Sequence, residues 1–390
     1  MTWDTKTQTF HGGQEHRFIH NFVEDFSVTT NYLGTPKAAL EAAKDSVSNG
    51  NYEEPFNAII LNQNVKKIVT CHHYPPADQE PAKSSLAEFL WPNDFQQFKD
   101  RLLLGNGASE VIDLVIRAAK STIKSDSTLT WKSGPWDTQY KEYYRSAESA
   151  NMRILDGNSK EVANVLCIVN PCNPTGDYMP LDEIKHWIEK NVHDGGFVIV
   201  DESMQPWHSA NFRDDSLTQQ AEFAADLYSR RNVSLYVLHS WTKIWSCTGL
   251  RLGSIICPTA EHCSELKRAQ VPWSVNTPAL AFLDSVVKDQ QYMQETWDGT
   301  SQLRSYLIEQ LSALPASKRE NFEYKGKDFL SWVWIEMRSE QVATEAVRLA
   351  KEAGVPVRSG QPGYIRPTHV RVAVREKQYV DVLIAAWQAL

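Results

Sequence analysis

Residues 240–253 read SWTKIWSCTGLRLG and place a single lysine, Lys243, between two tryptophans. Arg251 follows eight positions later, with a glycine two residues away on either side. A surface lysine would have polar neighbours, whereas apolar neighbours disfavour the ammonium form and make the amine available. Lys243 is therefore a candidate nucleophile toward a carbonyl group.

The chain around this stretch alternates short apolar strands with helical patterns from about residue 100 onward. Such alternation is typical of a mostly parallel sheet that helices cover on both faces. Helices are predicted over 108–120 and 181–190. The predicted strands are RLLLG (101–105), MRIL (152–155), VLCIVN (165–170), GFVIVD (196–201), SLYVLHS (234–240) and GSIIC (253–257).

The last hundred residues follow a different pattern, in which helices near 277–313 and 340–353 accompany the strands SWVWIEM (331–337) and HVRVAV (369–374). The predicted fold class is thus α/β, with a large domain and a smaller α+β domain that the N-terminal arm joins. The stretch 37–73 shows no strong periodicity. The predicted division is an arm with part of the small domain (1–73), a large cofactor-binding domain (74–275) and a C-terminal small domain (276–390).

Composition narrows the class of function. The chain has 390 residues, 42% of them hydrophobic and 23% charged, with a formal net charge of −8. This charge argues against a nucleic-acid partner, because phosphate binding needs a cationic face. The sequence predicts a cytoplasmic protein with no membrane partner, since neither a signal peptide nor a spanning apolar run is found. The six cysteines form no CxxC pair, so no metal site is predicted and the thiols are expected to be reduced.

Three further patterns lie at strand ends, where ligands of open α/β sheets collect. GNGASE (105–110) is a glycine-rich turn that leads into a helix, so its amides are placed either to bind a phosphate or only to cap the helix. NPCNPTG (170–176) is a rigid turn that can present an amide. VIVDES (198–203) ends a buried strand in Asp201, either as the partner of a protonated ring nitrogen or as a helix cap.

Together with the opening stretch, these patterns resemble those of the fold type I pyridoxal-phosphate enzymes, over nearly the whole chain. Within that superfamily the chain is most similar to threonine-phosphate decarboxylases, and next to histidinol-phosphate aminotransferases. The motifs that carry the resemblance are HGG (11–13), DFSVTTNYLGTP (25–36), YPPAD (74–78), GNGASE (105–110), YKEY (140–143) and TKIWSCTGLRLG (242–253).

The resemblance implies a role for each cofactor residue. Lys243 would hold pyridoxal phosphate covalently and move protons at the substrate, and Asp201 would keep the pyridine nitrogen protonated. The phosphate would be bound by Ser240, Arg251, the Ala108 and Ser109 amides and the Ser109 hydroxyl. Asn173 would bond the ring hydroxyl, Tyr140 would stack on the ring, and Tyr74 would reach the phosphate of a neighbouring subunit. The implied assembly is a homodimer with shared active sites.

For the substrate, the resemblance points to two arginines near the C-terminus and to the arm. Arg358 and Arg371 are thirteen residues apart, like two anion-binding arginines of the family. Arg371 would take the α-carboxylate or a distal anion, and Arg358 the other; a surface ion pair is the alternative for Arg358. The predicted arm contacts with the substrate come from Thr29, Asn31 and His16.

Two departures from the family pattern separate the candidate reactions. Met204 stands where aminotransferases of this type carry a tyrosine, and the arm reads TTNYLG (29–34) where the decarboxylases read NINPLG. These changes favour elimination and cyclisation of a hydroxylated basic amino acid such as hydroxyarginine, for which Glu15, His16, Glu24 and Asp25 could offer acid/base groups and carboxylates to a cationic substrate. The alternatives are a histidinol-phosphate type aminotransferase, a threonine-phosphate type decarboxylase and a non-catalytic cofactor-binding protein. A nicotinamide dehydrogenase fits less well, because GNGASE lacks the G-x-G-x-x-G spacing.

Overall fold

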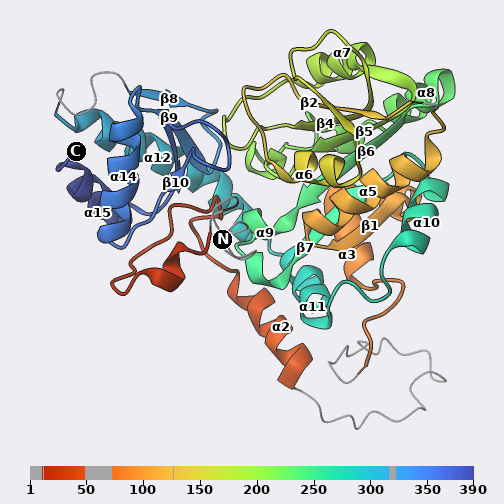
Figure 1. Cartoon of the computed structure of the whole chain (residues 1–390). Coiled ribbons are helices and arrows are strands. Elements are labelled where there is room, and N and C mark those ends of the chain that lie inside the picture. Colours follow the sequence, from red (N-terminus) through yellow and green to blue (C-terminus); the bar gives the residue numbers. More distant parts are fainter. Residues whose placement is uncertain (1–10, 12, 49–72, 126, 316–321) are drawn as a thin grey trace.

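The computed structural model describes residues 11, 13–48, 73–125, 127–315 and 322–390. It forms a large α/β domain and a smaller α+β domain side by side (Figure 1). The predicted fold class is confirmed. Within the described part of the chain, no helix is long and apolar enough to cross a membrane.

The large domain is built on a seven-stranded sheet with the order β1-β7-β6-β5-β4-β2-β3. Only β7 runs against its neighbours, and the other strands are parallel. All six strands predicted for this domain form, but the short strand β2 was missed because its residues, TWKS, carry no apolar run. The strands are β1 (Leu102–Asn106), β2 (Thr130–Ser133), β3 (Arg153–Leu155), β4 (Ala163–Val169), β5 (Val192–Asp201), β6 (Ser234–Ser240) and β7 (Leu252–Ile256).

Helices cover both faces of this sheet, as its apolar strands require. Successive residues of β5 enter opposite cores: Val198 and Val200 pack on one face, and Phe197 and Ile199 on the other. One face is covered by α3 (Ala82–Leu90), α7 (Leu181–Asn191), α8 (Ala221–Arg231), α9 (Trp241–Ile244) and α11 (Thr277–Val286). The other face is covered by α5 (Ala108–Thr122), α6 (Glu142–Ser149) and α10 (Ala260–Ala269).

The small domain is a four-stranded antiparallel sheet with helices packed on it, in the strand order β10-β11-β9-β8. Its core is separate from the two cores of the large domain and includes Phe26 of the N-terminal arm. The elements are β8 (Glu323–Lys325), β9 (Trp332–Glu336), β10 (Arg358–Ser359), β11 (His369–Ala373), α14 (Glu340–Glu352) and α15 (Lys377–Trp387).

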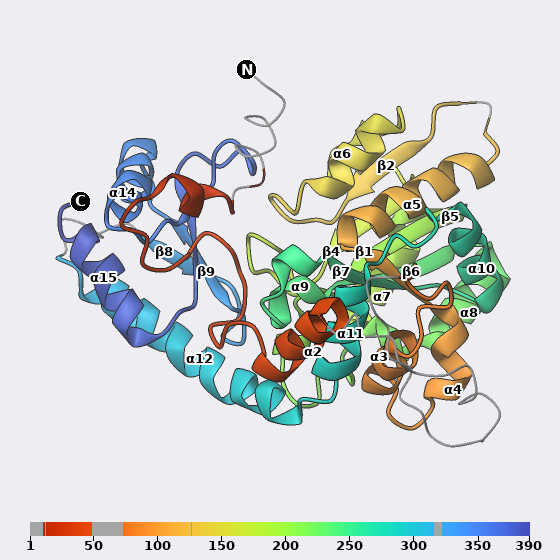
Figure 2. The same ribbon diagram turned by 90° about the horizontal axis from the view of Figure 1, so that it is seen from below.

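The long helix α12 (Gln290–Ala313) joins the domains, with Met293 in a large-domain core and Leu307 in the small-domain core (Figure 2). The buried side chains of α11, which follows the predicted boundary at 275/276, lie in the large-domain core, and the domain division stays a prediction. The stretch 37–73, which shows no strong periodicity, begins with a helix, α2 (Lys37–Ser48), that lies against α11. Residues 49–72 are outside the described residues.

The buried Arg375 is one of the residues that hold the N-terminal arm to the small domain. Arg375 donates to the backbone carbonyls of Asp25 (2.6 Å), Val28 (2.8 Å) and Thr30 (2.8 Å) and forms an ion pair with Glu24 (3.2 Å). Hydrogen bonds to a charged donor are stronger than neutral ones. The arm is thereby fixed in the place where the two domains meet.

Candidate active site

A pocket at the ends of the parallel strands gathers eight of the nine predicted cofactor residues. The neighbouring carboxyl ends of β4, β5 and β6 supply three of its walls, since parallel strands all end at the same edge. The N-terminus of α5 and the turn before β7 supply the rest. The pocket is lined by Ala108, Ser109, Tyr140, Val169, Asn173, Asp201, Ser203, Met204, Ser240, Lys243 and Arg251.

Lys243 lies in α9, directly after β6. Its Nζ donates to Thr242 Oγ1 at 3.2 Å. Burial, together with the positive charges of Arg251 and Arg371, lowers the pKa of Lys243 to about 8. The unprotonated amine is therefore far more populated near neutral pH than in an ordinary lysine, which is the direction that the apolar neighbours in the sequence predict.

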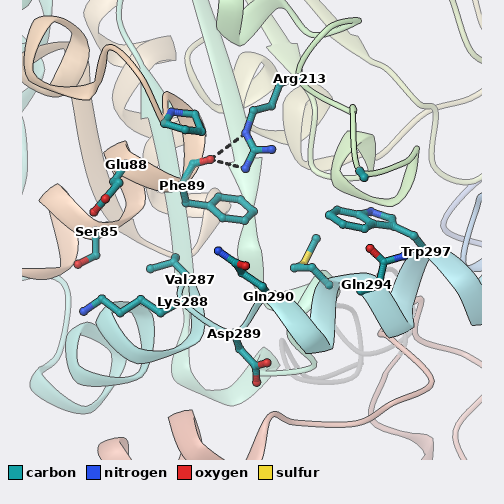
Figure 3. Close-up of a pocket in the computed structure, with 13 residues that line it drawn as sticks. Ser85, Glu88, Phe89, Arg213, Val287, Lys288, Asp289, Gln290, Gln294 and Trp297 are labelled. Atoms are coloured by element: carbon teal, nitrogen blue, oxygen red, sulfur yellow. Dashed lines mark hydrogen bonds between the residues drawn. The ribbon is translucent and has the colours of Figure 1, made fainter.

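The two tryptophans beside Lys243 form the wall behind it. Trp241 and Trp245 are buried and stacked on each other with ring centroids 5.0 Å apart. Phe89 meets both rings edge-on at 6.0 and 5.8 Å. Phe89 also lines a separate cavity of about 510 Å³ between α3 and the start of α12, where Arg213 donates to its backbone carbonyl (Figure 3). That cavity shares no lining residue with the pocket of Lys243.

Asp201 ends β5 as a fully buried carboxylate with two fixed donors. The hydroxyl of Tyr143 donates to Oδ2 at 2.7 Å, and the backbone amide of Ser203 donates to Oδ1 at 2.9 Å. Burial raises the pKa of Asp201, and these hydrogen bonds together with the charge of Lys243 oppose the rise. A cationic partner at this place would further stabilise the ionised carboxylate against the effect of burial.

The glycine-rich turn before α5 packs directly against Arg251. Gly107 has a φ of +76°, and a Cβ added there would collide with the guanidinium of Arg251. A Cβ on Gly253 would collide with the backbone at Ala108, the first residue of α5. The two glycines thus let a helix N-terminus and an arginine approach each other closely, which is an arrangement suited to a phosphate.

The two predicted substrate arginines lie opposite each other on neighbouring strands. Arg358 of β10 pairs in register with Arg371 of β11, and both side chains are buried. Arg371 donates to Asn173 Oδ1 and to the Tyr364 hydroxyl (3.0 Å), so it adjoins the pocket of Lys243. The Tyr364 ring lies within 6 Å of both guanidinium carbons. Burial lowers the pKa of Arg358, and Arg371 lowers it further.

Of the predicted arm residues, Asn31 and Thr29 bond other parts of the protein, and His16 is exposed. Asn31 donates its side-chain amide to the Ile244 carbonyl (3.1 Å) and to Thr296 Oγ1 (2.6 Å), so a substrate contact would require exchange of these bonds. Thr29 is buried, and its carbonyl accepts from Ser331 Oγ. His16 is exposed in a short 3-10 helix, Glu15–Phe18.

The acidic groups expected to serve a cationic substrate are mostly engaged elsewhere. Glu24 pairs with Arg375, and Asp25 Oδ1 accepts from the Ser27 amide at 2.7 Å. The negative charge of Glu15 acts on Arg358, whose pKa it raises against the effect of burial. Glu24 and Glu15 therefore act on protein cations, and Asp25 accepts a backbone hydrogen bond.

Tyr74 lies apart from the pocket. Its side chain is 74% exposed and stacks on Trp273, with ring centroids 4.2 Å apart. Its predicted contact with the phosphate of a neighbouring subunit stays a prediction.

Three residues near the site were missed by the sequence analysis. Tyr143 is the last residue of the YKEY motif, so this motif could have predicted a second tyrosine at the site besides Tyr140. Ser203 follows Asp201 by two residues, and its Oγ accepts from the Ser240 amide at 2.7 Å. Tyr364 has no local pattern, because only the pairing of β10 with β11 brings it to the arginines.

Comparisons with known proteins agree with this geometry. The sequence profile of the family described as Aminotransferase class I and II matches residues 23–386. Histidinol-phosphate aminotransferase 2 of Methylococcus capsulatus is 25% identical, with 90% of this chain and 93% of that protein covered. The structure of histidinol-phosphate aminotransferase from Sinorhizobium meliloti in complex with pyridoxal-5'-phosphate superposes with a TM-score of 0.71, at 14% identity over 100% of this chain and 94% of that one. That of L-threonine-O-3-phosphate decarboxylase from Porphyromonas gingivalis gives 0.67, at 15% identity over 94% and 99%.

Proposed function

Because the chain belongs to the aminotransferase class I and II family, we propose that it is a cytoplasmic enzyme that transfers an amino group from a substrate with a phosphate or second carboxylate. Its cofactor is pyridoxal phosphate, which supplies an electron sink for the carbon next to the substrate nitrogen. The histidinol-phosphate aminotransferases among its relatives carry out a reaction of this kind, as their name states.

The residues of the pocket fit this cofactor. Asp201 would offer a buried carboxylate to a protonated ring nitrogen, and Asn173, which lines the same pocket, would offer its side-chain amide to the ring hydroxyl. The α5 N-terminus, Ser240 and Arg251 offer amides, a hydroxyl and a guanidinium to a phosphate. A neutral ligand of similar size would leave Asp201 and Arg251 without partners of opposite charge.

Lys243 is the group that moves the proton in the proposed reaction. A general base works best when its pKa is close to the working pH, and the pKa of Lys243 is lowered to about 8. The buried rings of Trp241 and Trp245 exclude water from the turn that carries it. Its amine is thereby held in one place with few competing proton donors.

The pair of buried arginines carries the proposal for the substrate. Arg358 and Arg371 place two buried cations next to the pocket of Lys243, where the charge of Glu15 acts on Arg358. A substrate with a phosphate or a second carboxylate would add negative charge beside both guanidinium groups and lower the cost of burying like charges together. A hydroxyarginine side chain would instead bring a third guanidinium to this place, so the arginine pair disfavours cyclisation of a basic amino acid.

One assay separates the candidate reactions. The purified protein with pyridoxal phosphate is incubated with histidinol phosphate, threonine phosphate or hydroxyarginine, each with and without 2-oxoglutarate. We expect turnover of an anionic substrate only when the keto acid is present, with glutamate as the second product. Carbon dioxide release from threonine phosphate without the keto acid would instead support decarboxylation.

Elimination remains the second candidate, because Met204 lines the pocket and cannot donate the hydrogen bond that a tyrosine would give. Its outcome in the same assay is a product one water lighter, formed without the keto acid. If no substrate turns over although the cofactor absorbance shows binding, the non-catalytic alternative is favoured.

The proposed enzyme is a homodimer in which Tyr74 completes the active site of the neighbour. The exposed stack of Tyr74 on Trp273 supports this assignment, since such an aromatic surface commonly marks an interface. Mixing Lys243→Ala chains with Tyr74→Phe chains tests it, because one of the two sites in a mixed dimer then has both groups. Demonstrated mixed dimers without any recovery of activity, from two impaired parents, would contradict a shared site.

A further inference from the structure

The cavity between α3 and the start of α12 has the size of a small-molecule site (Figure 3). Its volume of about 510 Å³ falls within the range of about 300–1,000 Å³ that is usual for ligand pockets. None of its lining residues lines the pocket of Lys243. The cavity is therefore a separate candidate binding site.

Much of the cavity wall is apolar. Its larger apolar side chains are those of Phe89, Pro92, Val287, Met293 and Trp297. The Nε1 of Trp297 donates to the Pro206 carbonyl at 2.8 Å, which fixes the plane of its ring. Two aromatic rings and a thioether provide surfaces against which a flat ring of a ligand can pack.

Arg213 brings a positive charge to this wall. Its guanidinium carbon lies 4.9 Å from the centre of the Phe89 ring and 4.4 Å from that of Phe212. Both Nε (2.8 Å) and Nη2 donate to the Phe89 carbonyl. Among the described residues, Nη1 has no acceptor and no carboxylate forms an ion pair with this arginine. A ligand carboxylate would give the guanidinium a charge-assisted hydrogen bond.

The other charged groups of the wall limit the charge of the ligand. Lys288 is paired with Asp284 at 2.8 Å. Glu88 and Asp289 also line the cavity, and Figure 3 shows Asp289 on the side opposite Arg213. These carboxylates would repel a phosphate with two negative charges, whereas a single carboxylate balances Arg213. The wall therefore favours a ligand with one negative charge.

Phe89 connects the cavity to the turn that carries Lys243. Its ring meets Trp241 and Trp245 edge-on, with ring centroids 6.0 and 5.8 Å apart. These tryptophans stand two residues before and two residues after Lys243. A ligand that packs on Phe89 therefore acts on the wall behind the lysine.

The first turn of α12 gives a second connection. Tyr292 stands in this turn between Gln290 and Met293, two residues that line the cavity. Its hydroxyl donates to the Ile244 carbonyl at 3.1 Å, and Ile244 directly follows Lys243. The cavity is thus linked to the lysine turn through α3 and through α12.

We propose that this cavity is an effector site for a small molecule with an aromatic ring and a single carboxylate, whose binding strengthens the binding of pyridoxal phosphate. The carboxylate pairs with Arg213, and the ring packs against Phe89 and Trp297. The bound molecule restricts Phe89 and the first turn of α12, which together hold the lysine turn. Because such coupling is reciprocal, the cofactor also strengthens the binding of the effector.

Isothermal titration calorimetry on the protein loaded with pyridoxal phosphate tests the site. Indole-3-acetate is the probe, and indole-3-acetamide, which has the same shape without the charge, is its matched control. We expect one indole-3-acetate to bind per chain, and the amide to bind at least about tenfold more weakly, because it brings no anion to Arg213. Absence of indole-3-acetate binding, or equal binding of the amide, would overturn the proposal.

Two variants of the cavity locate the bound probe. Arg213→Gln should weaken the binding of indole-3-acetate by at least about tenfold, because it removes the cation. Since this variant also loses the bonds to the Phe89 carbonyl, Ala210→Trp is the second one; it fills part of the cavity, removes no side-chain hydrogen bond and should also weaken binding. Arg268→Gln on α10, which lines a different cavity, is the matched control and should bind the probe like wild type.

The probe could instead bind beside the cofactor, and Arg371→Ala distinguishes the two places. We expect this variant to bind indole-3-acetate like wild type, because Arg371 does not line the cavity. Binding that is lost in Arg371→Ala and kept in Ala210→Trp would place the probe on the substrate side and overturn the proposal.

The coupling to the cofactor is measured by titrating pyridoxal phosphate into cofactor-free protein, with and without saturating indole-3-acetate. Coupling of ordinary size predicts about fivefold or more tighter cofactor binding in its presence, and no change in Ala210→Trp. Unchanged or weaker cofactor binding by the wild type would overturn the effector role. None of these measurements uses turnover, so their outcome is independent of the proposed amino transfer.

Discussion

The pocket around Lys243 and the surface around Arg358 and Arg371 were predicted with different success. Eight of nine predicted cofactor residues line one pocket, because the carboxyl ends of neighbouring parallel strands meet at one edge of a sheet. On the substrate side the arginines face each other, but Asn31 and the arm carboxylates bind other parts of the protein. The pattern of strands thus predicts which side chains meet at the edge of one sheet. The local sequence does not show in the same way where a separate arm packs.

The two regions also differ in what they demand of a ligand. The Lys243 pocket combines a lysine with a lowered pKa, a buried carboxylate and an arginine, so it can neutralise a ligand that carries both signs of charge. The arginine pair offers only positive charge. The first region is suited to the cofactor and the second to an anionic substrate.

The largest expected effect comes from Lys243→Ala. Loss of the lysine amine that lines the pocket should reduce turnover by about a thousandfold or more, while the fold persists. The melting temperature should not fall, since the ammonium form of Lys243 is already disfavoured by burial. Lys185→Ala on α7, whose Nζ bonds Gln220, is the control and should keep full activity. Turnover within a few-fold of wild type would remove Lys243 from the reaction.

Arg371→Ala should have the next largest effect and fall on the substrate side. Hydrogen bonds from a charged group are worth about 1.5–3 kcal/mol, so kcat/KM should drop about 10- to 150-fold, mainly through KM. Removal of this cation should also raise the pKa of Lys243. The rise of kcat/KM that accompanies deprotonation of Lys243 should then occur at higher pH. Arg338→Ala, an exposed arginine of the same domain, is the control. Equal losses for a substrate without a second anion would assign Arg371 to the α-carboxylate, whereas an unchanged KM would contradict substrate binding by Arg371.

Tyr143→Phe should have a smaller effect on the cofactor side. The Tyr143 hydroxyl lowers the pKa of Asp201 against the effect of burial, so its removal should raise that pKa. The acid limb of kcat/KM should then move to higher pH, with a loss of about two- to tenfold for one hydrogen bond. Tyr144→Phe removes an exposed bond to Glu148 and is the matched control. An unchanged acid limb would show that the ionisation of Asp201 does not control the pH dependence of kcat/KM.

The residues at strand and helix ends could be predicted from the sequence, whereas residues that act through distant contacts could not. The strands β5 and β6 and the helix α5 have strong apolar periodicity, and Asp201, Ser240 and Ser109 follow directly from their ends. By contrast, Arg375 clamps the arm through carbonyls about 350 residues away in sequence. Backbone carbonyls are present at every residue, so such contacts have no sequence pattern. The same holds for Tyr364, which contacts Asn173 of the large domain, 191 residues away in sequence, as well as Arg371 of β11.

The smallest expected effect on activity comes from Asn31→Ala, and it sharpens the distinction between the two regions. The Asn31 amide bonds the Ile244 carbonyl and Thr296, and its backbone amide donates to the carbonyl of Lys243 itself. These contacts make it a residue that holds the lysine turn against α12. Loss of the buried side-chain bonds should lower stability by about 1–3 kcal/mol.

Because none of the Asn31 contacts needs a ligand, KM in Asn31→Ala should stay within a few-fold of wild type while the melting temperature falls. Tyr32→Phe, which removes a nearby bond from the arm to the Glu295 carbonyl, is the control for a general loosening of the arm. A large rise in KM with an unchanged melting temperature would instead support the original expectation that Asn31 binds the substrate. The arm would then have to exchange its protein bonds for substrate bonds during the reaction.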